Sequence, residues 1–168
     1  MRRRVVPLLA GFLVVAGLAA GVLWAALGND DATDRQREVA ARGGQVMRFD
    51  LERTTHVFEK RPGGGVQTVV ADDPADGREV GKVRAHLREE AEAFAAGRYD
   101  DPAAIHGMEM PGLAELQAGA ARMSVSYEDV QAGGRIRYSS EDEALVRALH
   151  GWFDAQVSDH GRHAAESE

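Results

Sequence analysis

The feature that most constrains this chain is an apolar segment near its start. The residues from Val5 to Leu27 carry no charge. As a helix that rises about 1.5 Å per residue, this segment reaches roughly 34 Å, enough to cross a hydrocarbon core of about 30 Å. Arginines 2–4 precede it and Asp30 and Asp31 follow it. The positive-inside rule therefore predicts a cytoplasmic N-terminus and an extracytoplasmic remainder.

A cleaved signal peptide is the alternative explanation of this segment. Ala26-Leu27-Gly28 offers a small-x-small cleavage site before Asn29. The apolar run is longer than the usual signal core of about 7–15 residues, so we favour an uncleaved anchor over residues 1–28. The protein is then a single-pass cell-membrane protein with residues 5–27 in the membrane, or a secreted protein if the segment is removed. Either way, the rest of the chain is exported.

Charge and cysteine content exclude several classes of function. The chain has 20 Lys and Arg against 27 Asp and Glu, and residues 1–28 hold three of the basic side chains and no acidic one. The exported part is therefore strongly acidic, which excludes nucleic acid as its main partner because a phosphate backbone would be repelled. Cysteine is absent, which excludes disulfides, thiolate zinc sites and a cysteine nucleophile. The exported part must be stabilised by an apolar core.

The first half of the exported part predicts a tether, a hairpin and a helix. Residues 29–44 are polar, end in a Gly-Gly pair and have too few apolar positions for a buried helix face. The expected strands are Val46–Leu51, Thr54–Lys60 and, after a glycine-rich turn, Val66–Ala71. A helix follows, with Asp76 as N-cap and Glu79 at capping-box spacing.

The second half repeats this order. Tyr99–Gly112 is expected to be a loop, and a short helix is expected over Leu113–Ala121. Apolar residues alternate on both sides of the turn at residues 133–134, which predicts a second hairpin. Ser140, three residues before Glu143, predicts a capping box that opens a helix through residue 157, with a glycine exit at residue 161. Residues 163–168 are expected to be a disordered tail.

These elements predict an α+β domain over residues 45–162. Two hairpins, each followed by a helix, favour an antiparallel four-stranded sheet with both helices covering one face. The first helix should present its apolar stripe to that face and end near Gly97. One domain is also what about 140 exported residues allow.

Histidines are the candidate functional residues of the domain. Five of the six lie in or beside predicted structure: His56, His86, His106, His150 and His160. Imidazoles that converge from separate elements would form a transition-metal site, since a chain without Cys must use His, Met or carboxylate ligands. The expected loop adds Met108 and Met110 in an alternating pattern with His106, and soft thioethers favour copper first and zinc second. Asp154, four residues after His150, is a candidate to orient its ring.

Each candidate also has a structural explanation. His150 would be satisfied by Asp154 or Glu143, and His160 is a favourable cation near a helix C-terminus. Met108 and Met110 are of a type that commonly fills gaps in a core. The sequence contains no G-x-S-x-G, no H-E-x-x-H and no phosphate-binding P-loop, so the pattern favours metal binding over these catalytic chemistries.

Several short motifs give the chain a family resemblance. These motifs are Thr54-Thr55-His56-x-Phe58, Arg84-x-His86-Leu87, Ile105-His106, Pro111-Gly112, Leu149-His150-x-x-Phe153 and Asp159-His160-Gly161. With them the chain resembles, from Met47 to Gly161, a widespread family of small exported bacterial proteins of unknown function. The resemblance implies that the five histidines are functional. Many relatives have a second His at the position of Val57, and some have Pro at the position of Met110.

Proteins similar to this chain are sometimes labelled aspartate carbamoyltransferase, and the chemistry of the sequence argues against that activity. The catalytic chain of that enzyme is longer than this chain, has two domains and carries a Ser-Thr-Arg-Thr phosphate loop. This sequence has no Ser-Thr-Arg run. The regulatory chain of the enzyme needs a four-cysteine zinc site, and this sequence has no Cys.

The sequence therefore predicts a membrane-anchored extracytoplasmic protein that binds copper or zinc without turnover. An acidic interaction module is the alternative, in which the histidines are structural and the partner is a membrane-associated protein. A third hypothesis is a metal-dependent hydrolase that activates water next to Asp154 or Glu109.

Overall fold

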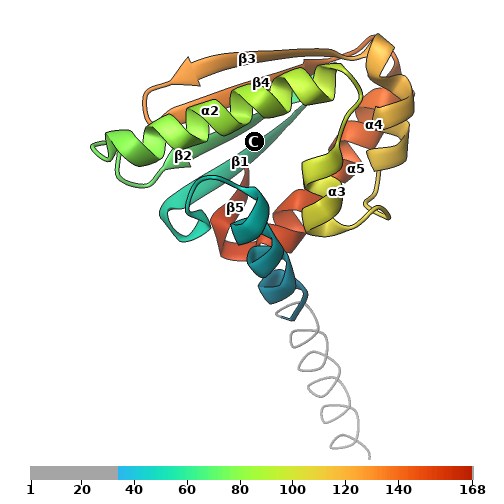
Figure 1. Ribbon diagram of the computed structural model, residues 1–168. Coiled ribbons are helices and arrows are strands. Elements are labelled where there is room, and N and C mark those ends of the chain that lie inside the picture. Colours follow the sequence, from blue (N-terminus) through green and yellow to red (C-terminus); the bar gives the residue numbers. More distant parts are fainter. Residues whose placement is uncertain (1–33, 168) are drawn as a thin grey trace, which may run out of the picture. The chain divides into compact units, whose positions relative to one another are not determined.

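The computed structural model describes residues 34–167, and the part of the chain that begins at Arg35 forms one compact unit (Figure 1). Its fold is α+β, with a five-stranded mixed sheet in the order β3-β4-β2-β1-β5. The predicted membrane segment, residues 5–27, lies outside the described residues. Within residues 34–167, no helix is both long and apolar enough to cross a membrane.

Two antiparallel hairpins supply four of the five strands, as predicted. The first pairs β1 (Thr54–Arg61) with β2 (Gly64–Ala71), and the second pairs β3 (Ser124–Val130) with β4 (Gly133–Ser139). Strands β2 and β4 join the two hairpins, also in antiparallel register.

Two long helices cover one face of this sheet, which confirms that part of the prediction. They are α2 (Gly77–Ala95) and α5 (Glu143–His160). Pairing places Phe58 beside Gln67 and Gln67 beside Ile136, so these side chains share a face. Phe58 meets Phe153 of α5 at a ring-centroid distance of 5.1 Å, and Leu87 of α2 packs in the same apolar core.

The predicted number of strands is wrong, because the sheet has a fifth strand. Strand β5 (Ala164–Ser167) pairs in parallel with β1 and comes from the segment predicted to be a disordered tail. Its sequence, Ala-Ala-Glu-Ser, has no β-branched or aromatic residue to indicate a strand. Pairing with the open backbone edge of β1 creates it, and a single-sequence pattern does not contain that information.

Three short helices also differ from the prediction or refine it. The expected loop after Tyr99 contains α3 (Asp100–His106), whose first turn holds two aspartates and a proline, a helix-start composition that was missed. Helix α4 (Leu113–Gly119) confirms the short helix predicted there. The strand expected over residues 46–51 is wrong, because that segment leads into η1 (Leu51–Arg53), which Asp50 caps.

The predicted helix caps are half right. The Asp76 carboxylate accepts from the Glu79 backbone N–H at 3.1 Å, as expected at the start of α2. The cap of α5 is Asp142 rather than Ser140, since its carboxylate accepts from the backbone N–H groups of Ala144 and Leu145. The Ser140 hydroxyl instead accepts from the Asp142 backbone N–H.

The expected tether contains a helix over residues 34–46. Its Val39 is fully buried, and its Arg35 forms an ion pair with Asp159 of α5 at 2.7 Å. Hydrogen bonds from Gln36 and Arg42 to backbone carbonyls of the domain also hold this helix, although its apolar stripe is too short to be recognised in sequence. The last two short elements are η2 (Ala120–Arg122) and η3 (Gly161–His163).

Gly112 allows α4 to approach α5, and it provides a test of the packing. Its φ of +77° is in the left-handed region, and a Cβ atom there would lie 2.0 Å from the Ala148 carbonyl oxygen of α5. We expect Gly112→Ala to lower the free energy of unfolding by roughly 2–5 kcal/mol in urea denaturation, because strain and overlap add.

Gly81→Ala is the matched control for this substitution. Gly81 lies inside α2, and a Cβ atom there would meet nothing within 4 Å. We expect this change to raise the free energy of unfolding by up to about 1 kcal/mol, because alanine favours a helix over glycine. Equal effects of the two substitutions would contradict the packing described here.

Candidate functional site

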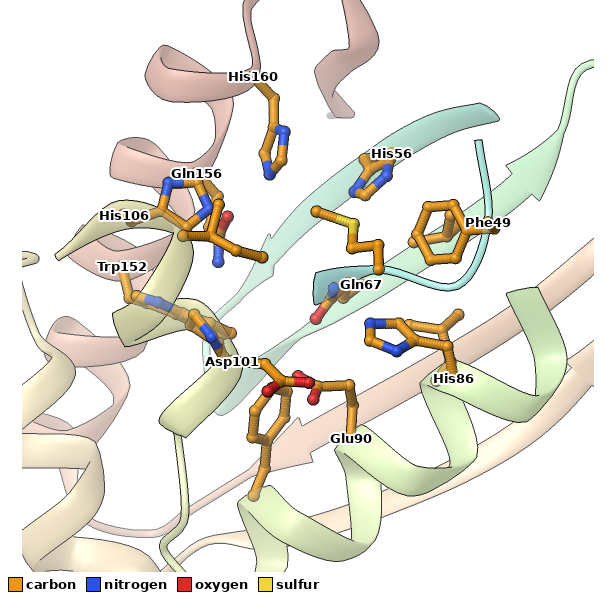
Figure 2. A pocket seen from close by; sticks show the side chains of 16 residues that line it. Phe49, His56, Gln67, His86, Glu90, Asp101, His106, Trp152, Gln156 and His160 are labelled. Carbon is orange, nitrogen blue, oxygen red and sulfur yellow. The ribbon is translucent and has the colours of Figure 1, made fainter. Parts of the chain in front are cut away.

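A small polar cavity lies between the helices and the covered face of the sheet (Figure 2). Its volume is about 40 Å³, enough for a few water molecules or for an ion with its ligands. Side chains from β1, β2, α2, α3 and α5 line it together with residues that precede β1. The polar ones are His56, Gln67, His86, Glu90, Asp101, His106, Gln156 and His160.

One end of the cavity carries an imidazole and two carboxyl groups. His86 and Glu90 lie one turn apart on α2, and Asp101 comes from the first turn of α3. One ligand atom from each of the three lies within 4.8 Å of the others. This spacing allows a single metal ion to contact all three.

Burial changes the protonation of this end. It raises the pKa of Glu90 to about 8, with further contributions from the nearby charge of Asp101 and a hydrogen bond to it. Burial also lowers the pKa of His86. At neutral pH the carboxyl pair of Glu90 and Asp101 therefore retains one proton. A bound cation would displace this proton.

The other end of the cavity carries three imidazoles from three different elements. His56 lies on β1, His106 is the last residue of α3, and His160 is the last residue of α5. The His160 ring lies between the other two, with ring-centroid distances of 4.9 Å to both. Figure 2 shows these three rings in the upper half of the view and His86, Glu90 and Asp101 in the lower half.

Burial keeps these three imidazoles neutral. Loss of hydration, with smaller repulsion from neighbouring histidines, lowers the pKa of His56 to about 3. The same causes hold the pKa of His160 well below its ordinary value. Burial also lowers the pKa of His106, although Asp159 opposes the effect. Neutral imidazole is the form that binds metals.

Asp159 fixes the orientation of the His106 ring. Its carboxylate lies 2.8 Å from His106 Nδ1 and accepts two hydrogen bonds from the Arg35 guanidinium, at 2.7 and 3.0 Å. Although burial opposes its charge, the hydrogen bonds from Arg35 and His106 hold the pKa of Asp159 below its usual value. An ionised carboxylate only accepts hydrogen bonds, so the neutral ring carries its proton on Nδ1, and Nε2 keeps a lone pair.

Two buried nitrogen atoms on cavity-lining residues have no protein partner. They are Nε2 of His56 and Nε1 of Trp152. Leaving such an atom unsatisfied costs about 1–3 kcal/mol. A cavity with these atoms is suited to a polar occupant, because water or a ligand can satisfy them.

The structure brings four of the five predicted histidines to this cavity and places the fifth elsewhere. His150 Nε2 lies 2.8 Å from the Gly64 carbonyl oxygen, a structural hydrogen bond that ties α5 to the first hairpin. Asp154, expected to orient His150, pairs with Lys60 instead. Glu109 lies in a separate surface groove.

The two predicted methionine ligands also lie outside the cavity. Met108 is 65% exposed, and Met110 packs in the apolar core. The predicted alternation fails because His106 ends a helix rather than lying in an extended segment. A different methionine, Met47, lines the cavity and was not predicted.

Sequence analysis missed both carboxylates at the cavity. Glu90 has a usable signal, since it lies four residues after His86 on a predicted helix and therefore on the same side. The acidic run around Glu90 hides this signal, because such runs usually form a solvated helix face. Asp101 has no comparable signal, because its approach depends on how α3 packs.

Comparison with known proteins does not add to these observations. No protein-family model, no curated protein and no solved structure matches the chain. The function is therefore inferred from the geometry and chemistry of the cavity.

The raised pKa of Glu90 predicts a pH-dependent stability of the metal-free protein. Between the ordinary value of 4.5 and about 8, the folded state holds one proton that the unfolded state has lost. The free energy of unfolding should therefore fall as pH rises through this interval, by up to about 1.4 kcal/mol per pH unit. Below about pH 6.5 the buried histidines make the free energy of unfolding rise with pH. The contribution of Glu90 must therefore be measured against a variant that lacks its carboxyl group.

Glu90→Gln isolates this contribution. Denaturant unfolding of the metal-stripped protein from pH 5 to 8 should show a stability that falls with pH in the wild type relative to Glu90→Gln. Glu92→Gln, at an exposed position of the same helix, should behave as the wild type does. Parallel pH profiles for wild type and Glu90→Gln would show that Glu90 is not perturbed.

Proposed function

We propose that this protein holds a transition-metal ion in its internal cavity, with His86, Glu90 and Asp101 as protein ligands. The observation that carries the proposal is the distance of at most 4.8 Å among one ligand atom of each residue. The unpartnered Nε2 of His56 on the same cavity supports a polar occupant independently. A cation would also stabilise the two carboxylates that otherwise repel each other.

Zinc fits this ligand set better than Cu(I). One imidazole nitrogen and two carboxylate oxygens are ordinary zinc ligands. The sequence-based preference for copper depended on the thioethers of Met108 and Met110, which lie outside the cavity. Without them, the three ligands offer no soft donor that would select Cu(I).

The size of the cavity favours binding without turnover. Sites for small molecules usually have volumes of about 300–1,000 Å³, whereas this cavity measures about 40 Å³. Metal ions and a few waters fit, but an organic substrate does not. This argues against the metal-dependent hydrolase. The interaction-module alternative gives no reason for buried polar atoms without partners at a common cavity.

We also propose that the protein is anchored in the cell membrane through residues 5–27, with the metal-binding domain outside the cytoplasm. This proposal depends on the uncharged segment and its flanking charges. A cysteine-free domain with imidazole and carboxylate ligands suits an exported location, because none of its ligands is lost by thiol oxidation.

Zinc binding tests the metal site. Calorimetric titration of the metal-stripped full-length protein should detect zinc binding at this cavity. Both His86→Gln and Asp101→Asn should weaken that binding by more than about tenfold, since loss of an outer partner alone typically has such an effect.

His150→Gln is the matched control, because His150 binds backbone carbonyls on the other side of α5. It should bind zinc as the wild type does. The proposal would be wrong if both cavity variants fold and bind zinc with wild-type affinity.

The anchor has its own test, which uses the absence of natural cysteines. We expect Glu115→Cys, at an exposed position of α4, to react with a membrane-impermeant maleimide in intact cells. The full chain should stay with membranes in alkaline carbonate washes, and deletion of residues 1–28 should abolish the association. Labelling only after cell lysis would contradict the proposed orientation.

A further inference from the structure

We propose that His56, His106 and His160 form a second, all-imidazole metal site in the same cavity, and that copper is its preferred ion. This inference goes beyond the zinc site, because the two ligand sets share no residue. Each site can therefore fail experimentally without the other.

The ring spacing fits joint coordination. Two imidazoles bound to one tetrahedral ion, with metal–nitrogen bonds of about 2.0–2.1 Å, have ring centroids roughly 5 Å apart. The observed distances from His160 to His56 and to His106 are both 4.9 Å. His160 is thus the central ligand, and the His56 ring, whose Nε2 has no hydrogen-bond partner, would rotate to complete the site.

His106 is already oriented as a ligand. Its Nδ1 is bound to Asp159, and Asp159 is held by Arg35. Arg35 also donates to the backbone carbonyl of His106 at 2.7 Å, so both ends of the residue are fixed. A carboxylate on the remote nitrogen of a histidine is the common outer partner of a metal-bound imidazole, which makes Asp159 a positioning residue.

His56 supplies the second independent observation. This residue is only 4% exposed, and its Nε2 has no hydrogen-bond partner. A structural histidine at a strand position would normally pair this atom with a backbone or side-chain group. A metal ion is an occupant that satisfies it together with the neighbouring rings.

The donor set favours copper over other divalent ions. Imidazole nitrogens bind Cu²⁺ more tightly than the other first-row divalent ions. The thioether of Met47 lines the same cavity and is a ligand type that also suits copper supplied as Cu(I). The two carboxyl groups lie at the other end of the cavity. Ions that prefer oxygen ligands are therefore expected to bind at His86, Glu90 and Asp101.

Electron paramagnetic resonance with Cu²⁺ tests the second site in the metal-stripped full-length protein. At one equivalent, we expect hyperfine coupling to about three imidazole nitrogens. His160→Gln and His56→Gln should each reduce the number of coupled nitrogens. Both should weaken copper binding by more than the roughly 100-fold limit typical of a lost outer partner.

His86→Gln and His150→Gln are the matched controls and should keep the copper signal. Circular dichroism shows whether each variant is folded, and zinc titration is a second check for His56→Gln, His160→Gln and His150→Gln. Copper coordination that is unchanged in folded His160→Gln and His56→Gln would overturn the proposal, as would loss of the signal in His86→Gln. If His86→Gln and Asp101→Asn leave zinc binding unchanged while the copper signal depends on His160, only the zinc site is refuted.

Asp159→Asn tests the positioning role separately. We expect a copper affinity about 10–100-fold lower. The imidazole ¹⁵N shifts of the metal-free protein should show His106 protonated at Nδ1 in the wild type and a mixture of both tautomers in Asp159→Asn. An unchanged tautomer and an unchanged affinity would refute a role for Asp159 in this site.

Discussion

The loss of hydration of ionisable side chains in one cavity controls the chemistry of this domain. Four imidazoles and two carboxyl groups face this space from α2, α3, α5 and β1. Burial makes charge costly there, so the histidines stay neutral and the carboxyl pair holds a proton. Neutral nitrogens and closely spaced oxygens in a space of this size are the conditions that a transition-metal ion requires.

The rest of the domain serves to hold these groups in place. The sheet supplies the position of His56, and the ring contact between Phe58 and Phe153 holds α5 against it. The ends of two helices, α3 and α5, bring His106 and His160 together. Arg35 lies shortly after the predicted anchor and contacts Asp159 and the His106 carbonyl. The start of the domain is thereby connected to the wall of the cavity, and through Asp159 to a proposed ligand.

Several features were predictable because their signals are local. The two hairpins follow from alternation on either side of glycine-rich turns, and α2 follows from its apolar stripe and the Asp76 cap. Histidines at 56, 86, 106 and 160 were candidates from residue type alone. Strand β5 and the position of Asp101 at the cavity were not predictable in this way, because long-range pairing creates the strand and helix packing positions the carboxylate.

The amino-acid sequence alone determined the membrane-like segment, the absence of thiol chemistry, the α+β composition and the set of imidazoles available as ligands. Each of these is a property of residue type or of short-range periodicity. The folded structure places His150 away from the cavity and brings Glu90 and Asp101 to it. The physical reason is that neighbours along the chain determine a helix or a hairpin, whereas the contacts among distant elements determine which side chains meet in a buried space.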